Sequence, residues 1–272
     1  MDNRAIGIFD SGVGGLSSVK KMLSDHPEES ILYFGDTGRA PYGSRTREEI
    51  VSMSLQDVHF LRTFDLKAIL IACNTITVCS LKALREANPD IPIIGVVDSA
   101  AEAAARATKN RKVGVIATKA TIDSDAYAQK IKEFAPDTEV FSAACPKFVP
   151  LIEAGKISPE NEELAAAIRE YCTELKEAGV DTLILGCTHY PLIAEAVGLF
   201  MGEGVQLIDS GAEPVKTVIR MLEEKEALAE KEKEGKEFYF CSGDVDAFGY
   251  VADLFLKKDI SSKSMRINIE NF

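Results

Sequence analysis

Two cysteines, Cys73 and Cys187, stand in similar sequence contexts about one domain-length apart. Each follows a short apolar run typical of a buried strand, and each precedes small polar residues that open a helical pattern, in ACNT (72–75) and GCTH (186–189). The backbone N–H groups and partial positive charge of a helix start favour thiolate, so we expect this position to lower the thiol pKa below about 8.5. His189 could hold or relay the proton of the second thiol.

A single cysteine in such a place is more often a small buried apolar residue than a reactive group. Two at equivalent places suit one task well if their sulfurs face each other across a cleft. One thiol would remove a proton from a tetrahedral carbon, and the other would return a proton to the opposite face, which is racemisation by two bases. The remaining cysteines lack this context and are interpreted as structural: Cys79, Cys145, Cys172 and Cys241.

The segment FDSGVGGLSS (9–18) follows the first predicted strand and opens a helix. Its glycines permit a tight turn with exposed N–H groups, a shape that binds anions. The spacing matches neither GxGxxG nor a Walker A motif, so the segment is a weak nucleotide signal. Asp10 and Ser11 lie at the carboxyl end of the strand. There Asp10 could accept a hydrogen bond from a substrate ammonium or from the proton-transfer network at Cys73, as a catalytic residue, or it could cap the helix.

Two further segments offer neutral donors for a carboxylate. The Pro41-Tyr42-Gly43 turn has backbone amides and a hydroxyl, and in ATKAT (117–121) the hydroxyls of Thr118 and Thr121 adjoin the N–H groups of a helix start. Taken alone, an ordinary turn and ordinary helix caps explain both segments.

The elements that must position these residues alternate between two patterns. Short apolar runs alternate with segments of helical periodicity, which indicates an α/β fold of mostly parallel sheets flanked by helices. The predicted strands span 5–9, 31–35, 68–72, 92–97, 112–117, 138–143, 182–186 and 205–208. The predicted helical segments include 46–64, 75–87, 119–134, 160–178 and 189–200. In such sheets ligands bind just past the carboxyl ends of the strands.

Similar segments return after roughly 110 residues and indicate two similar domains. The offsets are 107 for IGIFDS and VGVIAT, 114 for ILIACNT and LILGCTH, and 111 for VVDSA and LIDSG. We predict a discontinuous first domain of residues 1–97 plus 209–272 and a second of residues 98–208. The domains would be related by a pseudo-twofold axis, with the active site in the cleft between them.

Composition excludes several classes of protein. The net charge of −12 and the lack of a basic stripe argue against a nucleic-acid binder. Apolar runs are too short to span a membrane, and the first residues lack a signal-peptide pattern, so a cytoplasmic location is expected. The six cysteines show no CxxC spacing and the three histidines are scattered, so neither a disulfide scaffold nor a metal site is predicted.

Four segments together resemble the signature segments of the glutamate racemase family, in the same order and over nearly the whole chain: IGIFDSGVGGL (6–16), DTGRAPYG (36–43), ACNT and GCTHYPL (186–192). The resemblance implies a homodimeric enzyme without a cofactor that interconverts L- and D-glutamate and supplies D-glutamate for peptidoglycan. It also implies that Cys73 takes the proton from D-glutamate and Cys187 from L-glutamate.

The resemblance assigns further roles by position. Glu153, in PLIEAGK, corresponds to an acidic residue near the histidine of the second cysteine, here His189. The substrate contacts would be Asp10, Ser11, Pro41, Tyr42, Gly43, Asn74, Thr75, Thr118, Thr121 and Thr188, together with His189. The chain departs from the family at GVVDSA (95–100), where Asp98 and Ser99 replace the common Glu-Pro, which affects the stiffness of the crossover more than the chemistry.

Three alternatives stay open at this stage. A related racemase acting on aspartate or another acidic amino acid would differ in pocket depth, which a sequence does not show. A binding protein that uses the DSGVGG loop for a phosphate would bind its ligand without either cysteine. A hydrolase with a cysteine nucleophile would need one cysteine and would form a covalent adduct.

Overall fold

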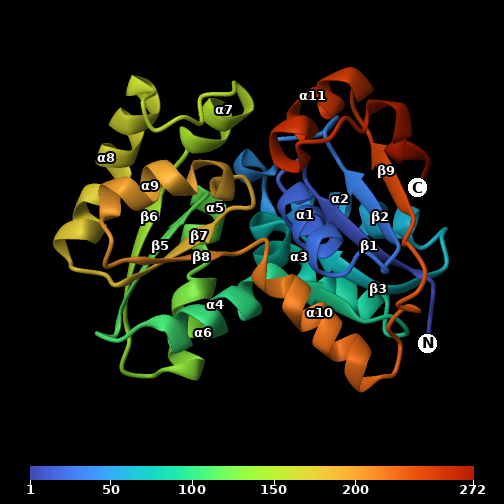
Figure 1. The fold of residues 1–272 in the computed structure, drawn as a ribbon, viewed down its shortest axis with the longest axis horizontal. Helices are drawn as coiled ribbons and strands as arrows, with labels where there is room; N and C mark the ends of the chain where they lie inside the picture. The colour runs from blue at the N-terminus through green and yellow to red at the C-terminus, as the bar shows by residue number, and fades with distance from the viewer. The chain divides into compact units, whose positions relative to one another are not determined.

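The computed structural model describes residues 1–272 apart from the side chain of Ser44, and the chain divides into two compact units. Unit 1 comprises Met1–Val96 and Pro214–Phe272, and unit 2 comprises Val97–Glu213. The bounds predicted from the sequence are 1–97 plus 209–272 for the first domain and 98–208 for the second. Each unit is a parallel sheet with helices on both faces (Figure 1). The predicted α/β class is therefore confirmed, since continuous apolar strands require cover on both faces.

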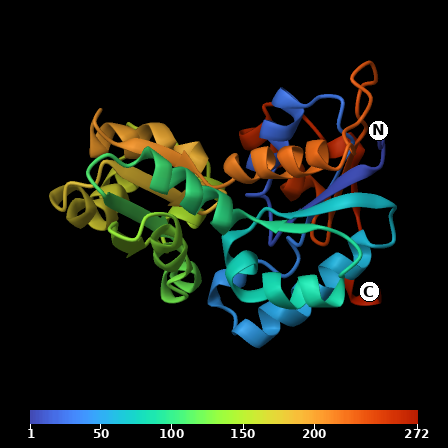
Figure 2. The same cartoon turned by 90° about the horizontal axis from the view of Figure 1, so that it is seen from below.

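The sheet of unit 1 has the strand order β10-β9-β2-β1-β3-β4, and every pairing is parallel. Its strands are β1 (Ala5–Asp10), β2 (Ile31–Gly35), β3 (Leu66–Ile71), β4 (Ile93–Gly95), β9 (Glu237–Cys241) and β10 (Ser264–Arg266). Figure 2 shows α2 and α3 below these strands and α10 above them. The helices are α1 (Leu16–Asp25), α2 (Arg47–Leu61), α3 (Asn74–Ala87), α10 (Glu213–Glu224) and α11 (Val245–Leu256), with the short 3-10 turns η1 (Tyr42–Ser44), η3 (Ser261–Lys263) and η4 (Ile269–Asn271).

The sheet of unit 2 has the parallel order β6-β5-β7-β8. Its strands are β5 (Lys112–Ala117), β6 (Glu139–Ala144), β7 (Thr182–Gly186) and β8 (Gln206–Asp209). Its helices are α4 (Val96–Ala107), α5 (Lys119–Asp123), α6 (Ala126–Phe134), α7 (Phe148–Glu153), α8 (Glu162–Glu177) and α9 (Ala194–Met201), with the 3-10 turn η2 (Tyr190–Ile193). In Figure 1 the helices α4 and α6 lie on one side of the strands and α8 and α9 on the other. Among the helices described, none is long and apolar enough to cross a membrane.

The central strands of both sheets pair in the same register, which supports the repeat. Gly7 of β1 is opposite Ile69 of β3, and Gly114 of β5 is opposite Leu183 of β7. A Cβ on either glycine would lie within 2.8 Å of the terminal methyl group of a leucine side chain, so in both units a leucine packs against the bare backbone of the first strand. The offsets of 107 and 114 residues therefore relate real structural equivalents.

The third proposed equivalence, VVDSA with LIDSG, pairs the correct strands, since β4 lies beside β3 as β8 lies beside β7, but its residue alignment is wrong. Strand β4 ends at Gly95, two residues earlier than predicted, and α4 begins at Val96. Asp98 consequently lies in the first turn of a helix, whereas Asp209 is the last residue of a strand. The buried alanines of α4 follow helical spacing, and alanine has the highest helix propensity, so this segment continues as helix rather than strand.

The predicted helical segment 119–134 is two helices instead of one. Helix α5 ends at Asp123, and Asp125 adopts the left-handed conformation with φ 54° before α6 begins at Ala126. Aspartate is one of the few non-glycine residues that enter this region readily. The segment 189–200 likewise begins with the 3-10 turn η2, which contains Pro191, before α9.

A buried ion pair ties together distant parts of unit 1. The Lys67 ammonium lies 2.5 Å from a carboxylate oxygen of Glu29, and both side chains are almost wholly buried. Lys67 also donates to the carbonyl oxygens of Asp2 and Ala227, and the other carboxylate oxygen of Glu29 accepts from the Ala229 N–H. Every partner therefore compensates part of the cost of taking these charges out of water.

Removal of one partner leaves the other charge buried and unpaired. We expect Lys67→Met to lower the free energy of unfolding by about 3–5 kcal/mol, measured by urea denaturation. The double variant Lys67→Met with Glu29→Gln should recover part of that loss, because no buried charge remains. A double variant as unstable as the single one would show that the loss is one of packing rather than charge.

Candidate functional site

In unit 1 the pairing of β1 with β3 brings the first candidate residues to one edge of the sheet. Phe9 is opposite Ile71, so Asp10 and Ser11 after β1 lie beside Cys73, which precedes the first residue of α3. The Ser11 hydroxyl is 3.5 Å from the Cys73 sulfur. The Asp10 carboxylate is buried and accepts a hydrogen bond of 2.7 Å from the Gly12 N–H, so it also orders the turn that follows it.

The glycine-rich turn is necessary for this close arrangement. A Cβ at Gly15 would lie 2.8 Å from the Cβ of Asp10 and 2.9 Å from the Cβ of Ala72, distances that real Cβ atoms do not adopt. The start of α1 therefore packs directly on the residue before Cys73 because position 15 has no side chain. The glycines of this segment serve close packing at the strand ends, in addition to any contact with an anion.

The expected lowering of the Cys73 pKa is wrong for this structure. Burial raises the pKa of the thiol well above its usual range, and the Asp10 carboxylate raises it further. The Ser11 hydroxyl and the backbone N–H groups of Ser11 and Ile76 oppose the rise without reversing it. The helix start is present as predicted, but desolvation of the charged form outweighs it because the thiol is only 6% exposed.

In unit 2 the pairing of β5 with β7 brings the second group of candidate residues, around Cys187, to the carboxyl ends of adjacent strands. Ala117 is opposite Gly186, so Thr118 and Cys187 follow adjacent strand ends. The Cys187 sulfur is 3.8 Å from Nδ1 of His189, and Nε2 of His189 is 3.1 Å from a carboxylate oxygen of Glu153. The Glu153 carboxylate can only accept here, so Nε2 carries the hydrogen and donates it, which leaves Nδ1 as an acceptor for the S–H group. The structure thus joins Cys187, His189 and Glu153 into one chain of polar contacts.

The other predicted neutral donors lie at helix starts. Thr118 caps α5: its side-chain oxygen accepts from the Thr121 N–H at 3.4 Å and lies 3.1 Å from the Thr121 hydroxyl. Asn74 and Thr75 open α3 directly after Cys73, and both are buried. Thr188, between Cys187 and His189, is buried as well. Within each unit, these residues therefore lie next to the cysteine in the chain or at the end of the strand that pairs beside it.

The Pro41-Tyr42-Gly43 turn is organised differently from our expectation. The Tyr42 hydroxyl is buried and donates to the Asp36 carboxylate, with Asp57 3.1 Å away, so the idea that this hydroxyl binds a substrate carboxylate is wrong. Pro41 and Gly43 on either side are exposed, which leaves the backbone of the turn accessible.

Asp36 and Asp57 were not identified from the sequence. Asp36 lies inside the DTGRAPYG segment, but its position before the turn suggests only an ordinary polar residue. The burial of Asp57 could have been predicted from the sequence, because Asp57 lies on the same helical face of α2 as the apolar residues Ile50, Met53 and Leu61. A carboxylate on a buried helix face is unusual and points to a specific partner.

The remaining cysteines fit a structural interpretation. Cys145 and Cys172 lie in the core of unit 2, and burial raises the pKa of both thiols, to about 12 for Cys172. The described residues include no group of three or more His, Cys, Asp or Glu side chains arranged to hold a metal ion.

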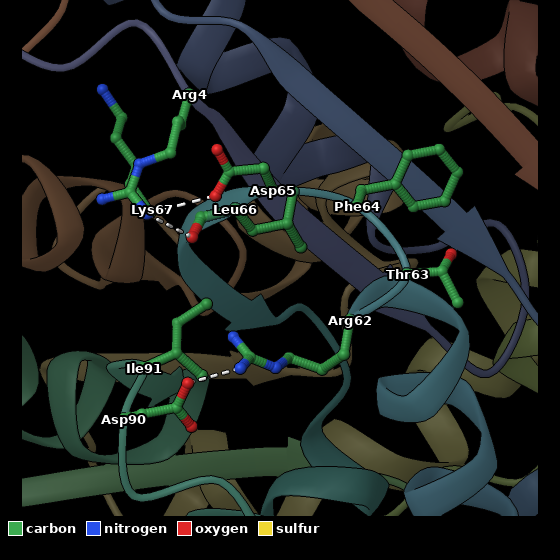
Figure 3. Close-up of a pocket in the computed structure, with 9 residues that line it drawn as sticks. All are labelled: Arg4, Arg62, Thr63, Phe64, Asp65, Leu66, Lys67, Asp90 and Ile91. Atoms are coloured by element: carbon green, nitrogen blue, oxygen red, sulfur yellow. Dashed lines mark hydrogen bonds and ion pairs between the residues drawn. The ribbon is translucent and has the colours of Figure 1, made fainter.

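One pocket, of about 420 Å³, lies at the opposite edge of the unit 1 sheet (Figure 3). It is formed where β1 and β3 begin, and none of the predicted site residues lines it. Its arginines are already paired: Arg4 is 3.3 Å from Asp65, and Arg62 pairs with Asp90. The pocket therefore lacks an uncompensated cation for an acidic ligand.

The protonation of Cys73 can be measured by alkylation. Because burial and the Asp10 carboxylate both raise the pKa, iodoacetamide should label Cys73 slowly at pH 8 and faster at higher pH, followed by mass spectrometry of the Cys73 peptide. We expect Asp10→Asn to move this pH profile to lower pH, because the carboxylate that helps to raise the pKa of the thiol is then neutral. Asp209→Asn is the matched control, since Asp209 also accepts from the N–H two residues on, at 2.7 Å. An unchanged profile in Asp10→Asn would contradict the electrostatic role of Asp10.

Comparison with known proteins agrees with this geometry. Residues 8–218 match the Asp/Glu/Hydantoin racemase family. The chain is 45% identical to a glutamate racemase of Geobacter metallireducens, over 93% of each chain. Its structure is similar to glutamate racemase RacE1 of Bacillus anthracis (36% identity, 98% of each chain, TM-score 0.92) and to the Francisella tularensis glutamate racemase in complex with D-glutamate (35%, 100% of each, TM-score 0.91). The chain therefore belongs to the Asp/Glu/Hydantoin racemase family of isomerases.

Proposed function

We propose that the protein interconverts L-glutamate and D-glutamate without a cofactor, with Cys73 and Cys187 on opposite faces of the α-carbon: the thiolate of one removes the α-proton, and the thiol of the other donates its own proton to the opposite face. The observation that carries this proposal is the equivalence of the two cysteines. Each follows the strand that pairs with the first strand of its sheet, and each sulfur has a polar side chain beside it. Glutamate as the substrate is supported by the glutamate racemases that match the full chain and by the D-glutamate bound to the Francisella tularensis protein.

At Cys73 the raised pKa has a consequence for catalysis. A thiolate that forms there is a stronger base than an ordinary thiolate, which suits removal of a very weakly acidic α-proton. In our proposal the substrate ammonium binds the Asp10 carboxylate. That contact would neutralise the negative charge that raises the pKa of Cys73, so substrate binding itself would help the thiol to ionise.

At Cys187 the proton can be exchanged through a histidine. His189 stands between the thiol and Glu153, and the carboxylate fixes which imidazole nitrogen faces the sulfur. We propose that His189 holds the proton of Cys187 while the thiolate removes the α-proton of L-glutamate. Glu153 stabilises the imidazolium that results, and its exposed side chain (47%) gives that carboxylate access to solvent.

Binding of the substrate carboxylates is assigned to neutral donors. Backbone N–H groups at the starts of α3 and α5, the exposed turn at 41–43 and the hydroxyls of Ser11 and Thr188 can share the negative charge through charge-assisted hydrogen bonds. The proposal requires the two units to meet around the substrate, so that one thiol reaches each face of the α-carbon and water is excluded. The proposal also includes a homodimer in the cytoplasm that supplies D-glutamate for peptidoglycan.

The proposal predicts a large and specific loss of activity in each cysteine variant. Cys73→Ser and Cys187→Ser should each lower kcat for racemisation of glutamate by about 10²–10⁴-fold, because a serine hydroxyl is a far weaker acid and a poorer proton donor. Loss of optical activity, followed by circular dichroism from L- and from D-glutamate, measures both directions. Cys79→Ser is the control, because Cys79 lies on α3 away from the strand ends.

Two results would count against the proposal. Retention of full activity in either variant would exclude the two-thiol mechanism. Faster turnover of aspartate than of glutamate by the unmodified protein would keep the mechanism and replace the substrate.

A further inference from the structure

Two buried carboxyl groups meet at a single phenol beneath the 41–43 turn. The Tyr42 hydroxyl donates to Oδ2 of Asp36, and Oδ2 of Asp57 lies 3.1 Å from the same oxygen. Both aspartate side chains are completely buried, and Tyr42 is 1% exposed. Neither carboxyl group takes part in the proposed proton transfer.

The number of protons in this cluster is constrained by its geometry. A phenol has one hydrogen, so Tyr42 can donate to one of the two carboxyl oxygens at a time. If both aspartates were ionised, the second oxygen would face a lone pair of the phenol, which is repulsive in a buried site. A proton on the second carboxyl removes the conflict, because that group then donates to the phenol, which donates to Asp36.

The charges of the cluster also indicate that one of the two carboxyl groups is protonated. Arg39 donates to Asp36 at 2.7 Å, to Asp57 at 2.8 Å and to Gln56 at 2.5 Å, and Glu270 lies 3.8 Å away on the exposed side. One guanidinium faces two buried carboxyl groups, so the buried set is neutral when one carboxyl is protonated. Burial raises the pKa of Asp57 well above its usual range, and the Asp36 carboxylate adds to the rise.

The cluster fixes the segment 36–45 at several points. Ser242 donates to the other oxygen of Asp36 at 2.6 Å and accepts from the Gly38 N–H at 2.8 Å. Arg45 donates to the Arg39 carbonyl at 2.8 Å, which closes the far end of the segment. Tyr42 therefore anchors the middle of a loop whose neighbours Pro41 and Gly43 are exposed.

We propose that Asp36, Tyr42 and a protonated Asp57 form a positioning network that holds the exposed backbone of the 41–43 turn in the geometry that binds a carboxylate of the amino-acid substrate. The inference rests on the proposed function for the identity of the substrate. The three residues act through the turn and do not touch the reacting atoms. A shift of the turn weakens substrate binding, whereas the thiols of Cys73 and Cys187 are left in place.

The test separates positioning from simple stabilisation. Tyr42→Phe removes one hydroxyl and should raise KM for glutamate about tenfold with kcat within about threefold, as expected for a lost hydrogen bond to a charged group. Asp57→Asn is the conservative variant, because an amide donates and accepts where a protonated carboxyl does. Its KM should stay within about threefold of the unmodified protein, as should that of the exposed control Asp65→Asn.

Three outcomes would overturn the inference. Tyr42→Phe with a lower Tm and an unchanged KM would make the network purely structural. Asp57→Asn with a larger KM increase than Tyr42→Phe would mean that Asp57 works as an anion. The third outcome concerns the infrared spectrum. The unmodified protein should show a protonated-carboxyl band at pH 7 that Asp57→Asn lacks. If the unmodified protein shows no such band, Asp57 is not protonated and the inference fails.

The infrared result is independent of substrate. If the unmodified protein does not racemise glutamate, the proposed function fails, while the presence or absence of the carboxyl band still decides the protonation on which the network depends. If only the inference fails, the unmodified protein racemises glutamate normally, but it shows no protonated-carboxyl band or Tyr42→Phe leaves KM unchanged.

Discussion

The parallel pairing of β1 with β3 and of β5 with β7 decides where both candidate catalytic cysteines lie. In each sheet a glycine on the first strand lets a leucine side chain pack against the backbone, and the two strands then end side by side. In each unit a cysteine lies within two residues of such a strand end: Cys73 directly before α3, and Cys187 three residues before η2.

The two thiols share a position but differ in their surroundings. Cys73 is buried beside a carboxylate and a hydroxyl, and burial first and the Asp10 carboxylate second raise the pKa of its thiol. Cys187 stands beside an imidazole that a carboxylate orients. A reaction that runs in both directions needs each group to be an acid in one direction and a base in the other. In our proposal the two thiols ionise in different ways. Ionisation of Cys73 is helped by the substrate ammonium, and ionisation of Cys187 is helped by a histidine within the same unit.

Much of this arrangement was predictable, because strand ends in parallel sheets follow directly from apolar runs. Asp10, Ser11, Cys73 and Cys187 were placed correctly at such ends from the sequence. The direction of the Cys73 pKa was not predictable, since it depends on how completely the thiol loses contact with water, which no local pattern records. The contact of Tyr42 with Asp36 and Asp57 was missed for a related reason: Asp57 comes from a different helix, and only the packing of α2 brings it to the turn.

The central claim is that one thiolate removes the α-proton and the other thiol donates a different proton to the opposite face. It is tested most directly by isotope distribution in early turnover. L-glutamate would be incubated with the protein in D2O without cofactor, and deuterium at Cα would be measured separately in L- and D-glutamate. Two bases predict that the first D-glutamate formed carries deuterium while the remaining L-glutamate keeps its hydrogen. Retention of the original hydrogen in the D-glutamate product would indicate a single base that returns its own proton and would contradict the account.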